Sequence, residues 1–302
     1  MRFSLTAFLL GATALGLVDT AWAQSAQTEP SAQTTELAQT EPATQPASVA
    51  PPAVDDDFRY LLGVSVSSGP EYWGAARNST GIKPLWAVRW GKWRLATSGS
   101  AALMGFGNEV VATGPGAGAT RDLFRSDKLR IGYGLRIDNG RGSDGSDITV
   151  GLPDVKKTLR GRVYGSYAVA PRWQVSGAFS QDLLDRQGGA SFDVGVSNQV
   201  FRSASGELTA GLNLSGGDGR NMNSYFGVPA DSPAATRLGR AFVPGAGLRE
   251  IGFSLGYTRA FSARWVGFTG IGVSRLLGPA ADSPITQRLA NHSWNMGLAY
   301  RN

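Results

Sequence analysis

Asn291, His292 and Ser293 are consecutive residues whose types match a hydrolytic nucleophile and base, and His292 is the single histidine of the chain. A serine nucleophile needs its histidine within hydrogen-bond reach, with a third polar group orienting the ring. The segment 291–300 alternates polar and apolar residues like a β-strand, whose neighbouring side chains point to opposite faces. His292 then shares the apolar face with Trp294, while Asn291 and Ser293 take the other. The three cannot converge, and we expect no enzymatic activity.

The residue types of the chain also give little indication of a cofactor or metal site. The chain contains no cysteine, so thiolate metal sites and disulfides are excluded. The segments 144–147 (Asp-Gly-Ser-Asp) and 216–219 (Gly-Gly-Asp-Gly) look like pieces of calcium loops, but they lack the ligand spacing and the bidentate Glu of such loops. We interpret both as surface turns and expect no cofactor and no metal ion.

Four arginines form the strongest cluster of chemistry-bearing side chains. Arg130 and Arg136 lie on one predicted strand, Arg160 and Arg162 lie on the next, and all four take the face opposite the apolar residues. Two interpretations remain open. The four could form a constriction that attracts anions, or they could pair with Asp193 and other acids in a filled interior. A small barrel leaves little internal space, which favours the paired interior.

The elements that must position these residues are strands, because the hydrophobic period from Phe58 onward is two. Segments of about ten residues, apolar on one face and small or polar on the other, are typical of a transmembrane β-barrel. Eleven such strands can be read, at 59–67, 83–90, 93–103, 128–138, 158–170, 173–181, 191–201, 207–215, 250–260, 265–275 and 291–300. Both ends should lie on the same side of the membrane, which requires an even number. We therefore predict an all-β, antiparallel barrel over 58–302 with 12 strands, or with 10 as the alternative, and place the missing strand in 105–124, near Glu109 to Thr113.

The turns predict an orientation. Short turns fall at 91–92, 171–172, 202–206 and 261–264, and outer-membrane barrels keep such turns on the periplasmic side. The long connections 68–81, 139–157, 216–249 and 278–290 then lie outside. Four tryptophans beside the short turns predict an aromatic girdle: Trp90, Trp93, Trp173 and Trp265. Four basic residues at the same turns predict a periplasmic rim: Lys92, Arg172, Arg202 and Arg264. The rim could meet acidic partner surfaces or could only anchor the barrel among lipid headgroups.

The N-terminal region predicts export and a tether. Residues 1–23 combine Arg2, an apolar run and the small residues Ala21 and Ala23, which predicts a signal peptide cleaved after Ala23. Residues 24–57 are rich in Ala, Gln, Thr, Pro and Glu and poor in large apolar residues, which predicts a disordered acidic linker in the periplasm. The first 57 residues hold one basic and seven acidic residues, so 58–302 carries 28 basic and 16 acidic residues, a net charge of +12. For an exported chain we expect outer-membrane lipid and lipopolysaccharide as partners, not nucleic acid.

Several motifs resemble those of the MipA/OmpV family of outer-membrane proteins. They are Pro70–Gly74 (PEYWG), Gly151–Val155 (GLPDV), Ser224–Val228 (SYFGV), Pro244–Arg249 (PGAGLR), Ser274–Gly278 (SRLLG) and Ala281–Ile285 (ADSPI). The resemblance covers 58–302 and implies a non-enzymatic scaffold of the cell outer membrane. In that family, the MltA-interacting protein is regarded as linking a lytic transglycosylase to a bifunctional murein synthase, and other members are described as surface antigens or adhesins. One departure is the C-terminus, where Arg301 and Asn302 follow the aromatic Tyr300 that usually ends such barrels.

Overall fold

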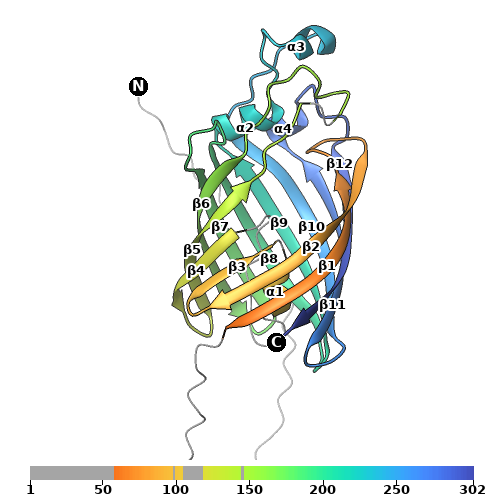
Figure 1. Ribbon diagram of the computed structural model, residues 1–302. Helices are drawn as coiled ribbons and strands as arrows, with labels where there is room; N and C mark the ends of the chain where they lie inside the picture. Colours follow the sequence, from red (N-terminus) through yellow and green to blue (C-terminus); the bar gives the residue numbers. More distant parts are fainter. Residues whose placement is uncertain (1–57, 98, 105–117, 144–145) are drawn as a thin grey trace, which may run out of the picture. The chain divides into compact units, whose positions relative to one another are not determined.

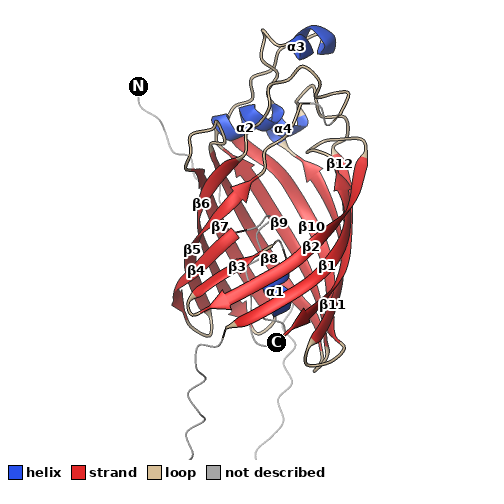
Figure 2. Ribbon diagram, in the orientation of Figure 1, coloured by secondary structure: helices blue, strands red, loops and turns tan. Residues whose placement is uncertain are grey.

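A closed antiparallel β-barrel forms the body of the protein (Figures 1 and 2). The computed structural model describes residues 58–97, 99–104, 118–143 and 146–302. In these residues the elements are β1 (Arg59–Pro70), β2 (Asn78–Trp90), β3 (Trp93–Ala96), α1 (Ser100–Met104), β4 (Gly118–Arg125), β5 (Leu129–Asp138), β6 (Thr158–Ala170), β7 (Trp173–Asp182), β8 (Ala190–Arg202), β9 (Gly206–Gly217), α2 (Gly219–Phe226), α3 (Pro233–Leu238), β10 (Gly247–Ala260), β11 (Trp265–Leu276), α4 (Gly278–Ala281) and β12 (Ala290–Arg301). Each strand pairs with its neighbours in sequence, and β1 pairs with β12 to close the barrel.

The two faces of the barrel wall follow the alternation in the sequence. On β5, Ile131, Leu135 and Ile137 are exposed on the outer surface, whereas Arg130, Gly132 and Gly134 are buried on the inner face. The other strands repeat this arrangement, so the outer surface carries a belt of exposed Leu, Val, Ile and Phe. An apolar surface of this extent is stable only against lipid. The belt identifies the outer face as the membrane-contacting one.

The prediction of 12 strands is confirmed for the described residues. The strand expected in 105–124 is β4, at Gly118–Arg125, and the narrower position near Glu109 to Thr113 lies outside the described residues. The alternation of β4 is hidden for two reasons. Arg121 pairs with Trp93 and lies over its ring, 5.6 Å from the centroid, and a bulge shifts the register between Asp122 and Phe124.

The predicted strand 93–103 is wrong after Ala96, because α1 occupies Ser100–Met104. Gly99 has a positive φ of 81°, a conformation that reverses the chain and that favours glycine. Ser100 donates its hydroxyl to the carbonyl of Trp86 at 2.7 Å, which holds the start of α1 against β2. Leu103 then packs on the inward-facing Leu61 and Leu85. The apolar run of this segment is compatible with a strand, but its Ala, Leu and Met residues also favour a helix.

The two ends of the barrel differ in their connections. At the end defined here as the short-turn end, strands are joined through 91–92, 126–128, 171–172, 203–205 and 261–264, and β1 begins and β12 ends there. At the opposite, long-loop end, the connections are 71–77, 139–157, 183–189, 218–246 and 277–289. Helices α2, α3 and α4 all lie at the long-loop end (Figure 2). None of the helices in the described part of the chain is long and apolar enough to cross a membrane.

Candidate functional site

One aspartate inside the barrel holds two buried arginines. Asp122 on β4 accepts a hydrogen bond from Nε of Arg130 at 2.8 Å and forms an ion pair with the guanidinium of Arg94. Tyr164 on β6 donates its hydroxyl to the same carboxylate at 2.8 Å. Arg94 is 5% exposed and Arg130 is 7% exposed, so neither charge has bulk water to replace this partner. We call these four residues the Asp122 cluster.

The Asp122 cluster depends on a glycine between its members. Gly132 on β5 pairs directly with Asp122 on one side and with Tyr164 on the other. A Cβ at Gly132 would overlap the phenol of Tyr164, so only glycine lets that ring lie across β5 and reach Asp122. The glycine on the inner face therefore makes room for the cluster.

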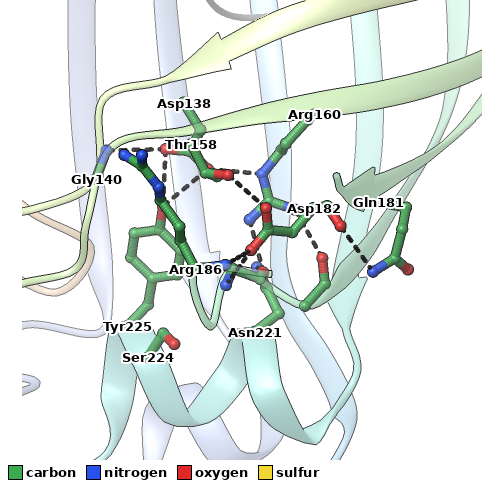
Figure 3. A network of polar contacts seen from close by, with 12 residues as sticks. Asp138, Gly140, Thr158, Arg160, Gln181, Asp182, Arg186, Asn221, Ser224 and Tyr225 are labelled. Atoms are coloured by element: carbon green, nitrogen blue, oxygen red, sulfur yellow. Dashed lines mark hydrogen bonds and ion pairs between the residues drawn. The ribbon is translucent and has the colours of Figure 1, made fainter. Parts of the chain in front are cut away.

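A second polar network joins the barrel wall to α2, and Figure 3 shows it from close by. Arg160 on β6 donates Nε to Asp138 on β5 at 2.7 Å and donates its two terminal nitrogens to the carbonyls of Gly188 and Gly189 at 2.7 and 3.1 Å. Tyr225 on α2 donates its hydroxyl to Asp138 at 2.8 Å. Arg160 is only 1% exposed. We call Asp138, Arg160 and Tyr225 the latch, because they tie α2 to β5 and β6.

The loop 183–189 completes the contact between the latch and α2. Asp182 accepts the backbone N–H groups of Leu184, Arg186 and Gly188 at 3.0, 2.7 and 2.8 Å, and it also accepts the hydroxyl of Thr158. Asn221 on α2 donates to the carbonyl of Gly188 at 2.8 Å. A single carboxylate therefore organises the loop that supplies two of the carbonyl partners of Arg160.

The long loops pack on one another and form a cap at the long-loop end. Met222, Tyr225 and Phe226 of α2 lie in a buried apolar cluster with Val155, Leu276 and Ala280, and Trp73 packs against it. The Trp73 ring lies edge-on to Tyr225 with 4.8 Å between centroids. A second cluster, outside the first, joins Leu152, Val228, Ala234, Ala235 and Ile285. The residues of the two clusters come mainly from the connections 71–77, 139–157, 218–246 and 277–289. The cap therefore has a small hydrophobic core of its own.

Hydrogen bonds and capping fix the cap loops in place. Asp218 accepts a hydrogen bond from the backbone N–H of Asn221 at 2.8 Å and so caps the first turn of α2. This is the role of Asp218 in the segment 216–219, whose sequence looks like part of a calcium loop. Tyr72 donates to the carbonyl of Ile285 at 3.1 Å. Ser283 donates to the carbonyl of Phe226 at 2.6 Å. No group of three or more His, Asp or Glu side chains in the described residues could hold a metal ion.

Two tyrosines of the cap are held in their protonated form. Burial raises the pKa of Tyr225, and the charge of Asp138 raises it further. Burial also raises the pKa of Tyr72 to about 12, against the opposing effect of Arg141. Both phenols therefore remain hydrogen-bond donors throughout the neutral pH range.

The four arginines predicted to cluster divide into two pairs. Arg130 and Arg160 are engaged by Asp122 and Asp138, respectively. Arg136 and Arg162 also lie on the inner face, where Arg136 pairs with Arg160 across the β5–β6 ladder. Asp193, the acid expected as their partner, forms an ion pair of 3.9 Å with Arg249. The four arginines thus share one sector of the wall. Asp122 and Asp138, which the sequence did not single out, neutralise Arg130 and Arg160.

The residues predicted to form a girdle and a rim lie together at the short-turn end. Trp90, Trp93, Trp173 and Trp265 each begin or end a strand there and are exposed. Lys92, Arg172, Arg202 and Arg264 lie in or beside the same turns and are also exposed. Inside this end, the inward-facing Leu61, Leu85, Ala87, Val266 and Ala299 pack with Leu103 of α1 into a third buried apolar cluster.

The positions of Asn291, His292 and Ser293 do not support a hydrolytic site. His292 pairs with Val273 on the outer face, whereas Asn291 pairs with Ser274 on the inner face and is buried. The described residues instead form a barrel with two buried charge networks inside it, a folded cap at one end and exposed basic residues at the turns of the other.

Sequence reasoning missed the residues that link distant segments. Asp138 and Tyr225 are 87 positions apart, and no local pattern relates them. Arg249 was missed because the alternation of 250–260, continued backwards, places it on the outer face. A bulge between Leu248 and Glu250 turns it inward, where it is 8% exposed and lies 4.3 Å from the ring centroid of Trp73.

Comparisons with known proteins bear on the family and the fold. The family model described as MltA-interacting protein MipA matches residues 62–302. No curated protein matches the chain. Among solved structures, the outer membrane protein OmpT of Vibrio cholerae is 11% identical, covers 82% of this chain and 97% of its own, and has a TM-score of 0.36. The KdgM porin is 8% identical with coverages of 80% and 98% and a TM-score of 0.38. An anion-selective porin from Comamonas acidovorans is 12% identical with coverages of 82% and 99% and a TM-score of 0.33.

Proposed function

We propose, from the premise that this chain belongs to the MipA family of MltA-interacting proteins, that it is a non-enzymatic outer-membrane scaffold for murein-remodelling enzymes. The observation that carries the proposal is the cap. Four long connections fold into one buried cluster at the long-loop end, and the latch ties that cluster to the barrel wall. A porin needs an open mouth, whereas a scaffold needs a rigid body with surfaces for its partners.

The short-turn end is the surface that we assign to those partners. Outer-membrane barrels place short turns and both chain ends in the periplasm, where murein and its enzymes lie. The predicted linker 24–57 would leave the barrel at this end, because β1 begins there. The family description names MltA as the partner of the family, and we propose a lytic transglycosylase of this kind, together with a murein synthase, as partners here.

The conductance of the purified barrel tests whether the cap closes it to ions. We expect the refolded 58–302 barrel to give no steady single-channel currents in a planar bilayer, because the cap is folded and the latch is buried. Steady anion-selective steps that change when Arg136 and Arg162 are replaced by glutamine would contradict the scaffold proposal. They would support the second candidate, a narrow anion channel, which the arginines of the interior favour.

The basic rim gives a second prediction. Replacing Lys92, Arg172, Arg202 and Arg264 together by glutamine should weaken capture of purified MltA by about tenfold and should flatten the salt dependence of capture, because exposed charges act through screened attraction. The measurement is surface capture on immobilised barrel at several salt concentrations. Arg77, Lys156, Lys157 and Arg288, which are exposed at the long-loop end, provide a matched quadruple glutamine control. Equal capture and equal salt dependence in the rim variant would show that these residues only anchor the barrel.

A further inference from the structure

Three arginines of the barrel interior carry charge that the described residues compensate only in part. They are Arg136 on β5, Arg162 on β6 and Arg249 on β10. Within the described part of the chain, Arg136 and Arg162 form no ion pair, and Arg249 reaches only Asp193, at 3.9 Å. The Nε atoms of Arg162 and Arg249 are buried and have no hydrogen-bond acceptor among the residues that the structure describes. Buried polar atoms of native proteins nearly always have partners, so two such guanidinium groups indicate an absent ligand.

Arg136 relates the three charges electrostatically. Arg136 is a cationic neighbour of both Arg162 and Arg249, and Asp193 is an acidic neighbour that both share. Glu250 is a further acid near Arg249, and its carboxylate already accepts the hydroxyl of Ser274 at 3.0 Å. Removing cations from bulk water without full compensation is costly. A bound anion would relieve both the desolvation and the mutual repulsion.

The surroundings of the three arginines suit a small polar ligand. Ser215 lies opposite Asp193 in the β8–β9 ladder and opposite Glu250 in the β9–β10 ladder, and its hydroxyl is buried without a hydrogen-bond partner among the described residues. The Trp73 ring of the cap lies over Arg249 at 4.3 Å and fixes that side chain. The side chain of Asp193 is 33% exposed, so solvent reaches the inner wall beside the arginines.

We propose that Arg136, Arg162 and Arg249, with Ser215, bind a small soluble oxyanion inside the barrel, on the inner side of the cap. The ligand class is a carboxylate or phosphate group. A guanidinium presents its N–H donors in a planar fork that matches two oxygen atoms of such a group. A spherical chloride ion does not offer two separate acceptor atoms to this fork. Arg130 and Arg160 do not belong to this site, because Asp122 and Asp138 already engage them.

Calorimetric titration of the folded barrel tests the site. The probes are inorganic phosphate and acetate, each replacing sodium chloride at constant ionic strength. We expect saturable binding of at least one probe with one site per barrel. Replacing Arg162 by glutamine should weaken that binding by about tenfold or more, since a charge-assisted hydrogen bond contributes on this scale. Arg162 forms no hydrogen bond or ion pair within the described residues, so its replacement should leave the fold intact.

Two further variants separate the site from general charge effects. Arg249→Gln should weaken binding to a similar extent, with folding checked by near-ultraviolet circular dichroism because it also removes the contact to Trp73. Arg288→Gln removes an exposed charge from the 277–289 loop and should leave the affinity unchanged. Absence of saturable binding to the unmodified barrel, or equal affinity in Arg162→Gln, would overturn the proposal. The result is independent of the scaffold proposal, because a barrel that does not conduct can hold an anion and a conducting one can lack this site.

Discussion

Replacement of Asp122 by asparagine should lower the free energy of unfolding by about 3 kcal/mol, since it leaves two buried arginines without their counter-charge. The side chains of Arg94 and Arg130 are almost inaccessible to water, and both contact the same carboxylate. Asparagine keeps the size of the side chain, so the loss reports on charge and not on a cavity. The measurement is urea unfolding of the barrel in lipid vesicles, followed by tryptophan fluorescence.

The same substitution at an exposed ion pair is the control for Asp122. Asp185 pairs with Arg220 at 2.9 Å, but their side chains are 81% and 63% exposed. Surface pairs of this kind contribute about 0.2–1 kcal/mol, so Asp185→Asn should scarcely move the unfolding midpoint. Asparagine also tolerates the positive φ of 50° at this position. Equal effects of the two substitutions would mean that burial does not set the strength of the Asp122 cluster.

Replacement of Asp138 by asparagine should release the cap. The change removes the counter-charge of Arg160, which is nearly fully buried, and weakens the bond from Tyr225 that holds α2. An uncompensated buried guanidinium costs about 3 kcal/mol or more, and part of that cost is avoided if the cap opens and water reaches Arg160. We expect trypsin to cleave the 218–246 connection, which contains Arg220, Arg237 and Arg240, at least about tenfold faster.

The control for the latch is Tyr225→Phe, which deletes one hydroxyl and keeps the ring against Trp73. This variant loses one hydrogen bond to a charged group, about 1.5–3 kcal/mol, but leaves the pair between Asp138 and Arg160 in place. Its cleavage rate should fall between those of the unmodified protein and Asp138→Asn. If trypsin cuts Asp138→Asn no faster than the unmodified protein, the apolar cluster alone holds the cap and the latch is dispensable.

The barrel itself follows from local rules that the sequence displays. Period-two alternation assigns each side chain to the inner or outer face, and this assignment holds for Arg130, Arg136, Arg160 and Arg162. Parity of the strands predicted 12, which is confirmed. The resemblance to the MipA/OmpV family is also confirmed, by the family model over residues 62–302. Alternation failed at Arg249, because this residue lies in the bulge between Leu248 and Glu250.

The barrel architecture and the face that each regular strand residue occupies follow from the sequence alone, because strand geometry relates them to immediate neighbours in the chain. Which arginines are paired follows only from contacts in three dimensions. Asp122 meets Arg94 and Arg130 across strand ladders, and Tyr225 meets Asp138 only because α2 folds back over the barrel. Such contacts depend on register and on loop packing between distant segments, which no local pattern encodes. The same reason explains why Arg249, rather than Arg130 or Arg160, joins Arg136 and Arg162 at the proposed oxyanion site.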